Sequence, residues 1–344
     1  MNFNNKWKGR AICLFFVSVI FAGCKTEDKV QQNNVEGNAL GTTYHLTYIG
    51  EELDSLDHKV DSIVFAVNHG LSTYQKNSLI SAFNNNSNEF RQDPNEAKHL
   101  MNDMQHFVEM VSLSKVISNE TSGAFDPSAA QLFSLYDQAK KEGVLMDEDK
   151  VEECLSYQGM QNIQFDEQGY PYKLDSFPLI QLNFNAIAKG YLVDIIADYL
   201  DSNGVDNFMV EVGGEMRVKG HNAENKSWQV GINVPLVGAN PNDFFKILEL
   251  QNVSLATSGN YQNYYEVDGK VIGHTLDPRN GEPVISNLKS VSVLHDYCAV
   301  ADAYATACMV MGLKESTKII EQNSSLSAFF IYEEKGELKG VYVE

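Results

Sequence analysis

The segment that most constrains this chain is LNFNAIAKGYLVDIIADYL, residues 182–200. The apolar residues at positions 179–184 predict a short buried strand. Apolar side chains then recur at helical spacing and define one face of a following helix: Leu192, Ile195, Ile196, Tyr199 and Leu200. Asp194, Asp198 and Asp201 are expected to point away from this face. A chain that contains this segment has to bury both a strand and one face of an amphipathic helix.

The junction between the predicted strand and helix, residues 183–190, contains small residues and one cation, Lys189. The first N–H groups of a helix are unpaired and carry partial positive charge, so a lysine beside them suits a phosphate group. An ordinary connection between a strand and a helix would use the same residues. The junction alone therefore leaves a phosphate site and a purely structural turn both open.

The N-terminus has the pattern of a bacterial export signal. Cations precede an apolar run over residues 11–21, which is too short to cross a membrane as a helix. The sequence FAGC that follows resembles a lipobox, so we expect a signal peptide over residues 1–23 and lipidation of Cys24. Residues 24–38 are polar and predict a tether to a folded domain over residues 39–344. This domain would be extracytoplasmic, lipid-anchored to a bacterial membrane and periplasm-facing. An ordinary signal peptide cut elsewhere is the alternative.

Charge and cysteine usage argue against several function classes. The formal net charge is −20, and cleavage of the signal peptide would remove cations only. Such an acidic chain without a basic stretch is not expected to bind nucleic acid or an anionic membrane surface, which leaves the lipid as the membrane anchor. The cysteines beyond the signal region have no Cys-x-x-Cys spacing, so we expect buried free thiols: Cys154, Cys298 and Cys308.

Helical and strand patterns are mixed along the rest of the chain. Helical spacing recurs near residues 51–69, 95–119 and 299–311. Alternating residues predict several strands, and Asp268-Gly269 predicts a hairpin turn. There is neither a regular βαβ alternation nor an internal linker. The predicted class is therefore α+β, with a single large domain.

Few residues can be named as catalytic or metal-binding candidates, because the common nucleotide-binding, zinc and serine-hydrolase motifs are missing. Asp302 and Thr306 are four apart in an alanine-rich predicted helix, where their oxygens could bind a hard cation such as magnesium. Alternatively, the aspartate caps the helix and the threonine bonds to its own backbone. His274 ends a predicted strand, where it could be a general base or a structural residue.

Further information comes from short motifs, which follow one another along the chain in this order: GTTY, STY, AFDP, NAIAKGYLVD, VEVGGEMRVKG, WQVGINVP, ATSGNY, HTLDPRNG and ADAYAT. In this order they resemble the ApbE-type FAD:protein FMN transferases, formerly called thiamine-biosynthesis lipoproteins. The resemblance covers about residues 40–312. It implies a single α+β domain with two lobes and a flavin site in the cleft.

The resemblance also implies roles for individual residues. Contacts with FAD would come from Leu40, Tyr74, Ala124, Phe125, Asp126, Asn183, Lys189 and Leu276. Magnesium would be held by Asp302, Thr306 and the backbone carbonyl of Ala186, and His274 would be the acid–base residue. The family often has an aspartate where this chain has Asn183.

The implied activity is a magnesium-dependent transfer of the FMN moiety of FAD to a threonine hydroxyl, with release of AMP. The acceptor would be a flavoprotein of a membrane redox complex. Such a transfer requires charge neutralisation and alignment at the phosphates. Three alternatives stay open. With water as the nucleophile, the same site would be an FAD pyrophosphatase that gives FMN and AMP. The chain could also be a non-catalytic flavin-binding lipoprotein, or an unrelated nutrient-binding one.

Overall fold

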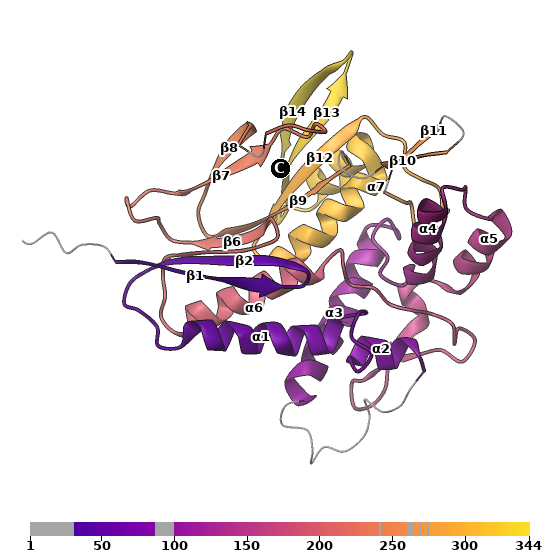
Figure 1. Ribbon diagram of the computed structural model, residues 1–344, viewed down its shortest axis with the longest axis horizontal. Coiled ribbons are helices and arrows are strands. Elements are labelled where there is room, and N and C mark those ends of the chain that lie inside the picture. The colour runs from indigo at the N-terminus through magenta and orange to yellow at the C-terminus, as the bar shows by residue number, and fades with distance from the viewer. Residues whose placement is uncertain (1–30, 87–99, 241, 261–263, 268–269, 274) are drawn as a thin grey trace, which may run out of the picture. The chain divides into compact units, whose positions relative to one another are not determined.

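An eight-stranded antiparallel sheet is the framework on which the other elements pack (Figure 1). The computed structural model describes residues 31–86, 100–240, 242–260, 264–267, 270–273 and 275–344. The strands of the sheet, in spatial order, are β1 (Gln32–Ala39), β2 (Thr42–Ile49), β5 (Phe208–Val212), β6 (Glu215–Lys219), β9 (Val253–Gly259), β12 (Leu288–His295), β13 (Ser327–Glu334) and β14 (Glu337–Val343). Every neighbouring pair in this order is antiparallel.

Both faces of the sheet are covered, because alternate residues of its strands enter two different cores. On β13, for example, Phe330 belongs to the larger core and Phe329 to the smaller one. The smaller core is closed by a hairpin of β7 (Trp228–Asn233) and β8 (Phe244–Leu250). The larger core is covered by helices, as Figure 1 shows below the sheet.

The helices of the larger core come from three parts of the chain. They are α1 (Leu56–Leu71), α2 (Leu79–Asn84), α3 (Leu100–Glu120), α6 (Ala188–Ser202) and α7 (Cys298–Gln322). α6 contacts α1, α7, β5 and β6, so the predicted central helix does lie at the centre of this layer. Within the described ranges, no helix is both long and apolar enough to span a membrane.

The remaining described elements lie outside the eight-stranded sheet. α4 (Ala130–Glu142) and α5 (Glu148–Tyr157) share a small core with Leu276. A short 3-10 helix, η2 (Met160–Asn162), leads to a small hairpin of β3 (Ile163–Phe165) and β4 (Pro171–Lys173). A second hairpin consists of β10 (Tyr264–Val267) and β11 (Lys270–Gly273). Residues 31–344 form one compact unit, and its mixed strands and helices confirm the predicted α+β class.

The predictions for two segments are wrong. Residues 179–184 do not form a strand, although Leu182 and Phe184 are buried as expected. The Asn84 side chain binds both the backbone N–H and the carbonyl of Leu182, so an amide takes the place of a neighbouring strand. The segment expected to be a tether is ordered from Gln32 onward as β1, an edge strand paired with β2 along its whole length. The predicted signal peptide and Cys24 lie outside the described residues.

The prediction that Asp194 of the central helix points into solvent is also wrong. On the apolar face Leu192, Ile196 and Leu200 are buried as predicted, and Asp194 is also buried, at 5% exposed, instead of pointing into solvent. Its carboxylate accepts hydrogen bonds from the N–H groups of Cys298 and Ala299, both at 2.9 Å. Residue Tyr297, which caps α7, provides no side-chain bond of its own. Asp194 therefore caps α7 from α6 and fixes the two helices against each other.

Candidate active site

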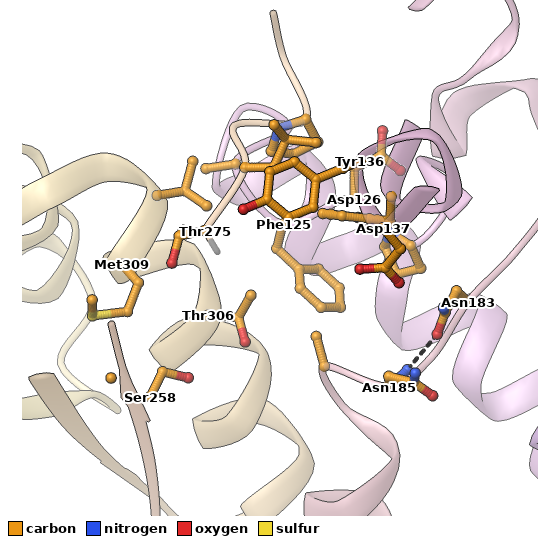
Figure 2. A pocket seen from close by; sticks show the side chains of 18 of the residues that line it. Phe125, Asp126, Tyr136, Asp137, Asn183, Asn185, Ser258, Thr275, Thr306 and Met309 are labelled. Atoms are coloured by element: carbon orange, nitrogen blue, oxygen red, sulfur yellow. Dashed lines mark hydrogen bonds between the residues drawn. The ribbon is translucent and has the colours of Figure 1, made fainter. Parts of the chain in front are cut away.

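A pocket of about 460 Å³ lies where α4, α7 and the segment before α6 meet. This volume is within the range of small-molecule sites. Figure 2 shows Thr306 and Met309 of α7 on one side and Asp126, Tyr136 and Asp137 on the other. The further lining residues include Ala124, Phe125, Phe133, Lys140, Asn183, Asn185, Ala186, Ser258, Thr275, Leu276 and Val310. The pocket thus combines apolar walls with several hydroxyl, amide and charged groups.

The turn after α3 forms one wall. Ser122 and Gly123 both have positive φ, which reverses the chain, and the Thr121 hydroxyl accepts the Phe125 N–H at 3.2 Å. Asp126 is held by the backbone N–H and the hydroxyl of Ser128, at 2.9 and 2.6 Å. Burial raises the pKa of the Asp126 carboxyl, while these two hydrogen bonds oppose the rise. The three residues predicted to contact FAD from this turn all line the pocket.

The segment before α6 forms a second wall. The Asn183 N–H donates to the carbonyl of Pro127 at 2.9 Å, which joins this segment to the turn after α3. The Asn183 side-chain oxygen accepts the Asn185 N–H at 2.9 Å, as the dashed line in Figure 2 marks. Ala186 follows and also lines the pocket. Asn183, which stands where the resembled family often has an aspartate, therefore shapes the local turn, and a carboxylate could accept the same bond.

α7 supplies the third wall, with Thr306 in the pocket and Asp302 one turn earlier. Asp302 is 3% exposed, and its Oδ2 accepts the Gly190 N–H of α6 at 3.1 Å. A side chain at Gly190 would be impossible, because a Cβ would lie 2.4 Å from the carbonyl oxygen of Cys298. The glycine of the AKGY motif thus permits the contact that brings the start of α6 to Asp302.

Lys189, which is half-buried, forms a charged group with the buried Glu215 and Asp302, here named the Lys189 cluster. The Lys189 Nζ is 2.7 Å from Glu215 Oε1, and the Glu215 side chain is 4% exposed. Burial acts to lower the pKa of Lys189, but the charges of Glu215 and Asp302 outweigh it and raise that pKa. Lys189 is therefore a permanent cation near neutral pH.

The Lys189 cluster has more negative than positive groups. Burial, and then the charge of Asp302, raises the pKa of the Glu215 carboxyl, and burial raises that of Asp302. The second oxygen of Glu215, Oε2, is buried without a hydrogen-bond partner among the described residues. Two buried carboxyl groups beside a single ammonium favour the uptake of a further positive charge, which either a proton or a metal cation can supply.

These residues fit a magnesium ion at Asp302, with the Thr306 hydroxyl and the Ala186 carbonyl as further oxygen donors. In the part of the chain that the structure describes, no group of three or more His, Cys, Asp or Glu side chains is arranged to hold a metal. A site there would consequently depend on neutral oxygens and on those of a bound phosphate, which is the pattern that magnesium accepts.

The structure does not bring every predicted residue to the pocket. Tyr74 is 84% exposed and does not line it. Leu40 lies in the tight turn between β1 and β2, with a φ of 50°, and packs against the large core. Lys189 and Asp302 do not line the pocket and belong to the Lys189 cluster. His274 lies outside the described residues.

Other lining residues were missed by sequence reasoning. Thr275 and Ser258 belong to the recognised motifs HTLDPRNG and ATSGNY, so their motif membership was an available signal. Glu215, which belongs to the Lys189 cluster and does not line the pocket, likewise lies in VEVGGEMRVKG. Asp137 and Lys140 face the pocket from α4, and no recognised motif includes them. Only the packing of α4 against the other walls reveals these two residues.

Comparison with known proteins agrees with this geometry. A model of the ApbE family matches residues 40–330. The FAD:protein FMN transferase of Vibrio cholerae is 32% identical over 312 residues, which are 89% of this chain and 88% of that protein. The FAD:protein FMN transferase of Haemophilus influenzae is 29% identical and covers 90% of this chain and 88% of its own length.

Comparison with solved structures also finds flavin transferases of the ApbE type. The flavin transferase ApbE from Vibrio cholerae superimposes with a TM-score of 0.77 at 29% identity, covering 92% of this chain and 98% of that one. The apo flavinyl transferase ApbE of Pseudomonas stutzeri has a TM-score of 0.74 at 27% identity, covering 92% and 95%. On the extent of the family match and of these similarities, the chain belongs to the ApbE family.

Proposed function

We propose that this chain transfers the FMN moiety of FAD to a threonine hydroxyl of an acceptor flavoprotein. The hydroxyl oxygen forms a new bond to the FMN phosphorus, and the bond from that phosphorus to the bridging oxygen breaks. AMP leaves with that oxygen, and the proton of the hydroxyl passes to a base. The observation that carries the proposal is the meeting of family-matched residues from distant segments in one pocket. Two of these lining residues are near members of the Lys189 cluster in the chain, since Ala186 comes three residues before Lys189 and Thr306 comes one turn after Asp302.

The residues of the site suit the charge changes of this reaction. Phosphoryl transfer depends mainly on alignment and on stabilisation of the phosphate charges. The Lys189 ammonium provides positive charge for the pyrophosphate. The walls formed by Phe125, Leu276 and Met309 exclude water from the bound nucleotide. His274 is the proposed base for the threonine hydroxyl.

Magnesium is the proposed metal of the site, held by Asp302, Thr306 and the carbonyl of Ala186. The buried carboxyl groups of Glu215 and Asp302 support this proposal, because their raised pKa values mean that the site favours an added positive charge. The chemistry that magnesium supplies is charge neutralisation at the two phosphates of FAD. Leu40 and Tyr74 are proposed to contact the parts of FAD that extend beyond the pocket.

The proposed location is outside the cytoplasm, on a membrane. The cations, the short apolar run and the FAGC sequence support export and lipidation at Cys24. A domain held on the membrane would meet acceptor subunits of membrane redox complexes that face the same compartment.

Binding and product analysis test the proposed function. FAD is titrated against the purified protein with and without magnesium, and AMP release is then followed with and without a flavoprotein subunit known to carry FMN on a threonine. We expect FAD binding and AMP release that requires the acceptor. AMP and free FMN formed equally well without the acceptor would indicate a pyrophosphatase. Bound but unchanged FAD would indicate a binding protein, and no FAD binding would contradict both.

A further inference from the structure

Glu215 is the member of the Lys189 cluster to which neither the motifs nor the pocket assign a role. It is the first residue of β6 and directly follows the Gly213-Gly214 turn. A Cβ at Gly213 would lie 2.7 Å from the Thr42 side chain and 3.3 Å from that of Lys189, so the turn passes close to the lysine. This turn delivers the Glu215 carboxylate to the Lys189 ammonium, 2.7 Å away.

Asp302 competes with Glu215 for the same cation. Its Oδ2 accepts the N–H of Gly190, the residue after Lys189, at 3.1 Å, and its charge raises the pKa of both Lys189 and Glu215. Within the described residues, the hydrogen bond and the ion pair of Lys189 go to Glu215, whereas the hydrogen bond of Asp302 comes from the Gly190 N–H. Because Lys189 pairs with Glu215, its ammonium does not fully neutralise the charge of Asp302.

We propose that Glu215 is a positioning residue that holds the Lys189 ammonium and thereby keeps the charge of Asp302 available for a divalent cation. The inference rests on the proposed function, since it concerns the magnesium of that site. Without the Glu215 charge, Lys189 would neutralise Asp302 and repel the cation. A unit charge removed from a buried cluster acts through a low effective dielectric, so we expect the magnesium affinity to fall by roughly tenfold or more.

The cluster permits a double-variant test based on charge alone. Glu215→Gln keeps the shape and removes one negative charge, while Lys189→Met removes the positive charge. The two changes together restore the net charge of the original cluster. We therefore expect weak magnesium binding by Glu215→Gln and recovery of most of the affinity in the double variant. If Glu215 only supports the local fold, the double variant will bind magnesium no better than Glu215→Gln does.

The measurement is calorimetric titration of magnesium into the mature protein, alone and saturated with FAD, so that catalytic turnover is not the readout. Glu224→Gln is the matched control, because that exposed carboxylate pairs with Lys226 on the surface. Its magnesium affinity should equal that of the wild type. Thermal unfolding of each variant checks that the fold is kept.

The outcomes separate this inference from the proposed function. If the wild type binds FAD and magnesium and Glu215→Gln binds magnesium equally well, the inference is wrong and the proposed function stands. If the double variant stays as weak as Glu215→Gln, the inference is also wrong. If the wild type binds neither FAD nor magnesium, both fail.

Discussion

The Gly190 N–H donates to Asp302 Oδ2 over 3.1 Å and so joins the start of α6 to α7. These residues are 112 positions apart in the chain. The contact places a helix N-terminus, the adjacent Lys189 and a buried carboxylate at one point. Phosphate groups and a divalent cation have opposite charges and need such groups side by side.

Asp302→Asn should separate metal binding from folding. Asparagine keeps an oxygen for the Gly190 N–H but has no charge for a cation. Because burial raises the pKa of Asp302, the ionised carboxylate destabilises the folded state near neutral pH, and its removal should not lower the melting temperature. We expect loss of magnesium binding and of transfer by a protein that unfolds at or above the wild-type temperature. Full activity at low magnesium would contradict the assignment.

Asp194→Ala should destabilise the protein far more than Asp198→Ala. Both aspartates accept a hydrogen bond from Arg217, but Asp194 is buried and also binds two N–H groups of α7, whereas Asp198 is 56% exposed. Leaving these N–H groups unpaired should lower the free energy of unfolding by about 2–4 kcal/mol. The exposed pair should contribute less than about 1 kcal/mol. Urea unfolding of the two variants measures the difference, and equal losses would refute the capping role.

His106 should make the stability depend on pH. Its Nδ1 lies 2.7 Å from the Tyr191 hydroxyl, which donates its only proton to Glu109, so the histidine donates to the tyrosine. Burial lowers the pKa of His106 below 6.5, although Glu109 and Asp103 oppose this. The unfolded chain therefore binds more protons, and the stability conferred by neutral His106 decreases as the pH falls through and below 6.5.

The His106→Gln variant tests this dependence. Glutamine can still donate to Tyr191 but does not titrate. Between neutral pH and about pH 5, the wild type should lose more free energy of unfolding than His106→Gln does. The exposed His58 offers a matched control, and His58→Gln should follow the wild type. The same pH dependence in all three proteins would show that His106 does not contribute.

His274→Ala tests the proposed base, which only the sequence supports. A general base contributes roughly 10²–10⁴ in rate, so turnover should fall by this factor. FAD affinity should change little, because a base acts on the incoming hydroxyl. Single-turnover rates and FAD titrations measure the two effects separately. A variant that turns over normally once saturated but binds FAD weakly would make His274 a binding residue.

The sequence predicted those parts of the site that depend on local pattern and recognised motifs. The spacing of Leu192, Ile196 and Leu200 correctly identified the buried face of α6. Ala124, Phe125, Asp126, Asn183, Ala186, Leu276 and Thr306 were named from motifs, and all line one pocket.

The failures have a common physical cause, which is that the partner of each residue comes from a distant segment. Asp194 is polar and looks like a solvent-facing residue, but the start of α7 provides the N–H groups that permit its burial. The strand expected at 179–184 is replaced by bonds to Asn84, almost a hundred positions earlier. Glu215 meets Lys189 only when β6 packs beside α6. Periodicity contains no information on these pairs.

The most direct test of the central claim is the intact mass of an acceptor protein. The acceptor subunit, which carries FMN on a known threonine in its natural state, is produced without flavin and incubated with this protein, FAD and magnesium. We predict a mass increase equal to one FMN less water, an equal amount of AMP, and no increase when the acceptor threonine is replaced by alanine. An acceptor of unchanged mass, in a reaction where FAD is consumed to FMN and AMP, would contradict the account.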